Sequence, residues 1–153
     1  WASGSPSLES RTWGETEPVT TAAESAYRQA EITDPQEEID LAEVDDTYAY
    51  KELQHLEALG LGDASALAQL LEEGELEPGG DLPVNVSGGS LGQGNLFEAN
   101  GLVRLLECVE QLRDEAGERQ VDEAYVAVAQ SARAVPSTSA AVIVLANDEG
   151  AGG

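Results

Sequence analysis

The sequence has very few basic residues. Its 153 residues include seven Lys and Arg, with Lys51 as the single Lys, against thirty Asp and Glu, so the formal net charge is −23. Nucleic acids and anionic membranes are bound through cationic surfaces, so this composition argues against both as partners. The acidic residues run along the whole chain and alternate with apolar ones, which indicates a folded domain rather than a disordered acidic tail. A salt-rich cytoplasm would screen the resulting repulsion. We interpret the source as a halophile, with an unusually acidic mesophilic protein as the alternative.

Long apolar runs and methionine are also missing. No apolar run approaches the ~18 residues of a membrane span. The first ten residues lack the basic start and apolar core of a signal peptide. We therefore expect a cytoplasmic protein. No Met occurs, not even at position 1, which indicates a fragment or a numbering that begins after processing.

The chain has one cysteine, Cys108, and one histidine, His55. A single Cys excludes an internal disulfide, and its place on the apolar side of an expected helix indicates a buried structural thiol. No pair of His or Cys residues exists to hold zinc or iron, so we expect no metal site. His55 itself is interpreted as a partly exposed helix residue without a catalytic role.

The chain divides into an extended lead-in at 1–17, a domain at 18–147 and a flexible tail at 148–153. We expect helices at 19–30, 48–60, 65–72 and 97–115, and strands at 39–44, 82–86, 124–129 and 140–145. Two strand–helix units followed by a hairpin predict an α/β fold in which helices cover a mixed sheet.

The most informative segment is a glycine-rich loop at 87–95, between the expected strand 82–86 and the helix that follows. Backbone N–H groups in a loop of this kind can bind a phosphate or an oxyanion. A tight turn without a ligand is the alternative interpretation. The loop and its flanks resemble a motif of the thiolases, chiefly the archaeal and sterol-carrier-protein type, within the acetyl-CoA C-acyltransferase superfamily. The positions that match in register are Asn85, Ser87, Gly88, Gly89, Gly94, Ala99 and Gly101.

The resemblance extends from about Ala22 to Leu145 and implies the C-terminal half of a thiolase. It implies a five-stranded mixed sheet covered by helices. In the family this half packs on a similar N-terminal half, which carries the nucleophilic Cys and is absent from this sequence. The lead-in at 1–17 matches the region between the two halves.

Three catalytic positions of the family fall on residues of other types here. Asp45 replaces a His or Asn that holds an oxyanion, and a carboxylate would repel that charge. Asn95 replaces the catalytic His, and an amide cannot accept a proton. Gln130 begins the loop that in the family supplies an acid–base Cys or His. The resemblance also implies that the loop residues Ser87, Gly88, Gly89 and Gly94 approach a coenzyme A thioester, although Glu98 replaces a family Gly and disfavours an acyl or phosphate group there.

These substitutions predict a thiolase-like domain with degenerate catalytic motifs that is inactive alone. It would act in acyl-CoA metabolism as a half or subunit of a larger enzyme, without a bound cofactor. We expect a homodimer, or a complex with an N-terminal half or a full thiolase. Two alternatives remain open: a non-enzymatic module that pairs with a complete thiolase, and a truncated remnant without function.

Overall fold

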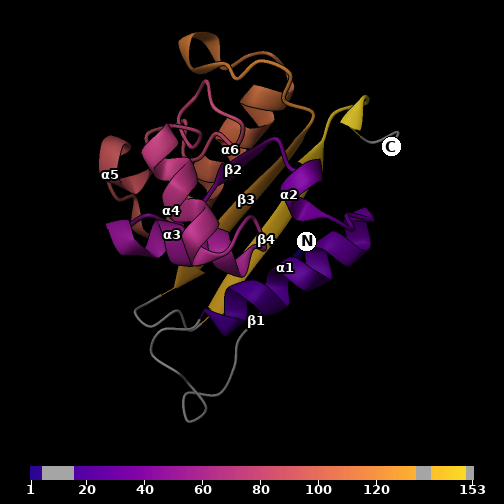
Figure 1. Ribbon diagram of the computed structural model, residues 1–153, viewed down its shortest axis with the longest axis vertical. Helices are drawn as coiled ribbons and strands as arrows, with labels where there is room; N and C mark the ends of the chain where they lie inside the picture. Colours follow the sequence, from indigo (N-terminus) through magenta and orange to yellow (C-terminus); the bar gives the residue numbers. More distant parts are fainter. Residues whose placement is uncertain (5–15, 134–138, 151–153) are drawn as a thin grey trace.

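A four-stranded sheet forms the centre of the protein. In the computed structural model, which describes residues 1–4, 16–133 and 139–150, the strands are β1 (Ala2–Gly4), β2 (Leu41–Glu43), β3 (Val126–Arg133) and β4 (Ser139–Ala146). Their spatial order is β1-β4-β3-β2 (Figure 1). β2 runs parallel to β3, and the other two pairings are antiparallel. The sheet is therefore mixed, as expected.

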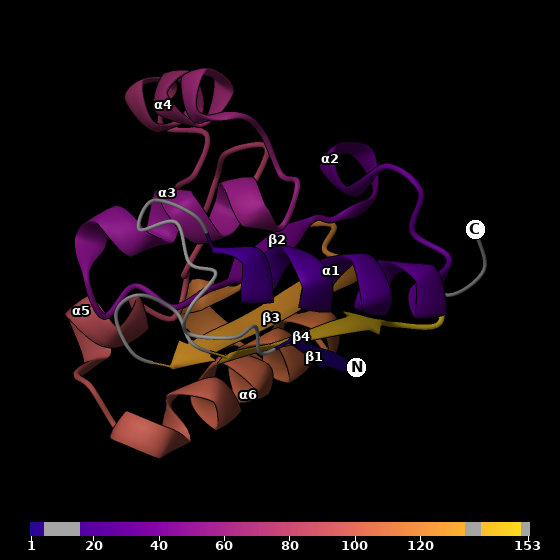
Figure 2. The ribbon, with the colours of Figure 1, turned by 90° about the horizontal axis from the view of Figure 1, so that it is seen from below.

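Helices cover both faces of this sheet. They are α1 (Glu17–Ala30), α2 (Pro35–Glu38), α3 (Ala49–Ala58), α4 (Ala64–Glu73), α5 (Gly89–Gln93) and α6 (Asn100–Leu112), with short 3₁₀ turns η2 (Phe97–Ala99) and η3 (Gly117–Arg119). Figure 2 shows α1 and α3 on one side of the sheet and α6 on the other. None of the helices in the described part of the chain has the length and hydropathy to span a membrane.

The residues of β3 explain this layering. Val126 and Val128 face the α1 side, where they join a core that contains Val19 and Leu56. Ala127 and Ala129 face α6, and their small side chains leave room for that helix and its buried Cys108. Because both faces of β3 are covered, its first five residues are buried without interruption.

The predicted five-stranded sheet is wrong for the described residues, because 82–86 does not form a full strand. This segment makes one isolated parallel bridge, between Ala42 and Val84. Pro83 has no N–H to donate, and Asn85 has a positive φ of 51° that turns the chain out of an extended conformation. The segment therefore ends after two backbone hydrogen bonds to Ala42.

Other differences concern the ends of elements. The helix predicted at 97–115 consists of η2 followed by α6, which ends at Leu112. The start of the predicted lead-in forms β1, while its residues 5–15 lie outside the described part. Gln130 lies inside β3 rather than at the start of a loop, because the two hairpin strands continue to Arg133 and from Ser139.

Candidate functional site

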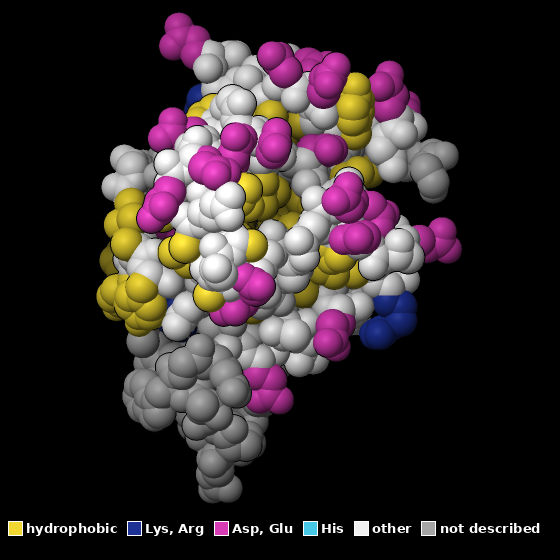
Figure 3. Space-filling model, viewed as in Figure 1, with side chains coloured by type: hydrophobic (Ala, Val, Ile, Leu, Met, Phe, Trp, Pro, Cys, Tyr) yellow, Lys and Arg dark blue, Asp and Glu magenta, His cyan; other side chains and the backbone are white. Residues whose placement is uncertain are grey.

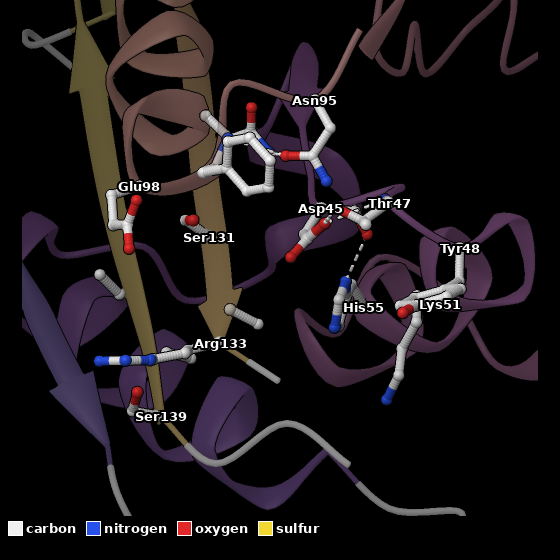
Figure 4. Close-up of a pocket in the computed structure, with 15 residues that line it drawn as sticks. Asp45, Thr47, Tyr48, Lys51, His55, Asn95, Glu98, Ser131, Arg133 and Ser139 are labelled. Atoms are coloured by element: carbon white, nitrogen blue, oxygen red, sulfur yellow. Dashed lines mark hydrogen bonds between the residues drawn. The ribbon is translucent and has the colours of Figure 1, made fainter. Parts of the chain in front are cut away.

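A pocket of about 770 Å³ lies where several elements end. Its wall combines the β2–α3 connection, α3, the start of α6 and the facing ends of β3 and β4 (Figure 4). Polar and apolar side chains share this wall. They are Asp45, Thr47, Tyr48, Lys51, His55, Asn95, Phe97, Glu98, Asn100, Ser131, Ala132, Arg133, Ser139, Ala140 and Ala141.

Two of the three predicted catalytic positions, Asp45 and Asn95, meet in this pocket. Asp45 Oδ1 accepts hydrogen bonds from Thr47 N at 3.0 Å and Thr47 Oγ1 at 2.7 Å. Asn95 Oδ1 accepts hydrogen bonds from Phe97 N at 2.8 Å and Asn100 Nδ2 at 2.9 Å. These bonds orient the Asn95 amide nitrogen toward Asp45 and Thr47 (Figure 4). Asn95 can thus donate a hydrogen bond in the pocket, although it cannot act as a base.

The third position, Gln130, lies outside the pocket and contacts the backbone of Asp45. Its side chain is 1% exposed, and its Oε1 accepts a hydrogen bond from Asp45 N at 2.8 Å. It is absent from the residues that line the pocket. The loop between β3 and β4, where the resemblance puts an acid–base residue, is 134–138 and lies outside the described residues.

The chain's one Lys and one His also line the pocket, one turn apart on α3. The interpretation of His55 as partly exposed is wrong, since it is 1% exposed and its Nδ1 lies 2.7 Å from the Asp45 carbonyl oxygen. That oxygen can only accept, so Nδ1 carries the proton. Burial lowers the pKa of His55 to about 4 and also lowers the pKa of Lys51. The occurrence of each residue type once, four positions apart, is the signal that could have drawn attention to them.

The glycine-rich loop lies beside the pocket and is tied to the chain's own carboxylates. Glu43 accepts hydrogen bonds from Ser87 N at 3.0 Å and Ser87 Oγ at 2.7 Å. Asp46 accepts hydrogen bonds from Ser90 N at 2.7 Å and Leu91 N at 3.1 Å. Gly89 permits the latter contact, because a Cβ there would overlap the Asp46 carboxylate. The N–H groups that could hold a phosphate thus already bind Asp46.

The residues predicted to approach coenzyme A, Ser87, Gly88, Gly89 and Gly94, are therefore separate from the large pocket. Three of them border a second cavity of about 10 Å³ instead. A cavity of this size has room for about one water molecule. Their position beside a thioester stays a prediction.

A buried charge cluster lies beneath the loop, against α6. Arg104 is 3% exposed, and its Nη2 lies 3.4 Å from Asp45 Oδ1 and 3.5 Å from Asp46 Oδ1. Burial raises the pKa of Glu43 to about 7, and the Ser87 hydrogen bonds act against this shift. Burial also raises the pKa of Cys108, so this thiol is not an activated nucleophile. Within the described residues, no three His, Cys, Asp or Glu side chains are grouped to hold a metal ion.

The fold and the pocket define a mixed α/β domain with a site at one end of the sheet, beside a glycine-rich loop. Residues 3–147 match the family model described as thiolase C-terminal domain-like, and the chain belongs to this family.

Relatives of known name agree with this assignment. An acetyl-CoA acetyltransferase of Methanothermobacter thermautotrophicus is 34% identical over 122 residues, which are 80% of this chain and 31% of that protein. Human sterol carrier protein 2 is 38% identical over 107 residues, which are 70% of this chain and 19% of that protein. The chain thus spans less than a third of the length of either relative.

A solved structure shows the same fold. A chain from the Ltp2-ChsH2(DUF35) aldolase superposes with a TM-score of 0.78 at 22% sequence identity. The match covers 97% of this chain and 39% of that one.

Proposed function

We propose that this chain is the C-terminal half of a thiolase-like acyltransferase of acyl-CoA metabolism and needs a partner for activity. The observation that carries the proposal is the set of residues that line the pocket. Asp45 and Asn95 both line the pocket, the resemblance matches them to two of the family's catalytic positions, and Asn95 cannot accept a proton. His55 is a weak substitute as a base, because its pKa is about 4 and its Nδ1 is committed to Asp45.

An apolar surface supports the need for a partner. Five large apolar side chains on α5, α6 and the segment between them are more than half exposed: Leu91, Leu96, Phe97, Leu102 and Leu106. Only one acidic residue, Glu98, lies between 82 and 106, in a chain with thirty such residues. Exposed apolar surface of this kind marks an interaction site. We propose that it is covered in a homodimer, or by an N-terminal half or a full thiolase.

The setting we propose is the cytoplasm of a halophilic organism, as the acidic composition suggests. Coenzyme A thioesters are the proposed substrates, and no resident cofactor is required. Pairing with a complete thiolase as a non-enzymatic module is the second candidate, which the same apolar surface favours.

The proposal can be tested by completing the enzyme. We would co-express this chain with the N-terminal two thirds of the Methanothermobacter acetyltransferase, because the resemblance implies that a C-terminal half packs on an N-terminal half. Sedimentation in molar KCl measures association, and acetoacetyl-CoA thiolysis measures activity. We expect a complex, and no thiolysis by the chain alone. Asn95→His should raise thiolysis in the complex about 10²-fold or more, because it restores a proton acceptor.

Asn147→His is the matched control, because Asn147 lies beyond β4 and does not line the pocket. It should leave activity unchanged. Turnover by the isolated chain that Asn95→Ala abolishes would contradict the proposal. A complex with a full thiolase in which neither Asn95 variant changes the rate would favour the interaction module.

A further inference from the structure

Arg104 connects three separate segments through one nitrogen atom. Its Nη2 donates to Ser90 Oγ at 2.8 Å and lies within 3.5 Å of both Asp45 Oδ1 and Asp46 Oδ1. The guanidinium therefore joins α6 to the β2–α3 connection and to α5. Arg104 Nε and Nη1 are buried, and no acceptor contacts them among the described residues.

Each of these segments positions a group in the pocket. Asp45 lines the pocket itself. Asp46 and Ser90 fix the start of α5, and the loop then continues to Asn95. Gln93 Nε2 donates to Ser87 O at 2.7 Å and closes the loop. A substitution at Arg104 would therefore shift the positions of both Asp45 and Asn95, although Arg104 does not line the large pocket.

The local charges explain why the connection needs a cation. Asp45 and Asp46 approach the same nitrogen in a site where Asp46 is 2% exposed. Without a positive charge between them, the two carboxylates would repel each other strongly at low dielectric. Asp46 would keep its two backbone donors, whereas the Asp45 carboxylate, which is 15% exposed, would be held by Thr47 N and Thr47 Oγ1 without the cation.

We propose that Arg104 is a positioning residue that acts as a point charge, holding Asp45 and the glycine-rich loop in their pocket geometry. Its polar side-chain contacts with the described residues all converge on Nη2, so the forked shape of the guanidinium is not used there. Arg119 shows the contrast, since its Nε and Nη2 both contact carboxylates of Glu107 and Glu110. An ammonium group should therefore replace Arg104 but not Arg119. The role of Arg104 in activity rests on the proposed function of the pocket. Its role in holding Asp45 and the loop in place does not.

Amide hydrogen exchange in molar KCl tests this inference without any assay of activity. The Leu91 amide reports the Asp46 contact, the Asn95 side-chain resonance reports the pocket, and the Val128 amide in β3 reports global unfolding. In Arg104→Gln we expect exchange at Leu91 to rise more than about tenfold relative to Val128, with a displaced Asn95 resonance. In Arg104→Lys the ratio of Leu91 to Val128 exchange should stay within about threefold of the parent, and the Asn95 resonance should not move.

Arg119→Gln removes an equal charge outside the network and should not change the ratio of Leu91 to Val128 exchange. Ser90→Ala keeps every charge, so it tests the network even if Arg104→Gln does not fold, and it should speed Leu91 exchange about threefold. Equal damage by Arg104→Lys and Arg104→Gln would overturn the point-charge role. A ratio that stays at the parent value in Arg104→Gln, or in Ser90→Ala, would overturn the positioning role and leave the proposed function standing.

Discussion

At the scale of single residues, the protein keeps an acidic side chain where most domains have an apolar one. Glu43 is fully buried at the end of β2, between the Ser87 hydroxyl and the α6 side chains Arg104 and Glu107. Burial raises its pKa from the ordinary value of 4.5 to about 7. The folded state therefore favours the protonated carboxyl. The stability that this group contributes is complete below pH 4.5 and is lost as the pH rises through 7.

Glu43→Gln should remove this dependence on pH. The amide has the same shape and can donate to Ser87 Oγ while accepting from Ser87 N. We expect equal unfolding free energies for the variant and the parent near pH 4, and a variant more stable by about 3 kcal/mol above pH 8. Urea unfolding at constant KCl measures the difference, which also cancels the contribution of His55. Glu38→Gln should act in the opposite direction, because backbone hydrogen bonds from Thr33 and Asp34 lower the pKa of Glu38. A constant difference between pH 5 and 8.5 would refute a titrating Glu43.

The sequence predicted part of the site for identifiable reasons. Asp45 and Asn95 lie in two motifs that the resemblance assigns to catalytic positions, and both line the pocket. Cys108 was predicted as buried from its helix face, and it is 0% exposed. The burial of His55 and Gln130 could not be predicted, because it depends on how α3 and β3 pack around Asp45, and periodicity along one segment does not contain that contact.

At the scale of elements, α5 is a five-residue helix that depends on tertiary contacts. A helix this short is unstable alone. Asp46 accepts hydrogen bonds from its Ser90 and Leu91 amides, and Ser87 anchors the preceding turn to Glu43. The helix is therefore fixed by carboxylates of β2 and the connection after it.

Two glycines of this helix should respond differently to the same substitution. Gly89 has φ +58°, and a Cβ there would overlap the Asp46 carboxylate, so Gly89→Ala should cost about 2–4 kcal/mol. Gly92 has open space and should gain up to about 1 kcal/mol as alanine in the helix. Thermal unfolding of both variants measures the contrast. Similar losses in the two proteins would mean that the Asp46 contact does not fix α5.

The same local chemistry explains which elements could be predicted. The helix at 19–30 and the hairpin strands were confirmed, because long amphipathic or β-branched runs carry their own signal. The segment 82–86 has the apolar composition of a strand, but Pro83 and the positive φ of Asn85 limit it to one bridge.

At the scale of the whole molecule, acidic side chains are distributed rather than clustered. Figure 3 shows Asp and Glu spread over the visible face, with few basic groups between them. With a net charge of −23, this arrangement leaves most carboxylates repelling their neighbours. Salt should therefore stabilise the fold by screening this repulsion.

The midpoint of thermal unfolding should rise by at least about 5 °C between about 0.1 M and molar KCl, which corresponds to about 2 kcal/mol. Most of the rise should occur below about 1 M, because the screening length falls from about 10 Å to about 3 Å over this range. Differential scanning calorimetry gives the profile. A flat profile would contradict the charge argument, and a linear rise far beyond 1 M would indicate salt exclusion from the surface instead.

The order of the strands also has a consequence for synthesis on the ribosome. Every pairing in the described sheet includes β3 or β4, and neither begins before Val126. β1 emerges before the other described strands, yet its partner β4 is the last of them to be made. The helices α1 and α3 are made well before β3 and β4, so their core faces stay uncovered until those strands are synthesised. Such long-range closure makes folding slow. During that interval the acidic side chains already present repel other nascent chains, so the charge that weakens the finished fold protects the unfinished one from aggregation.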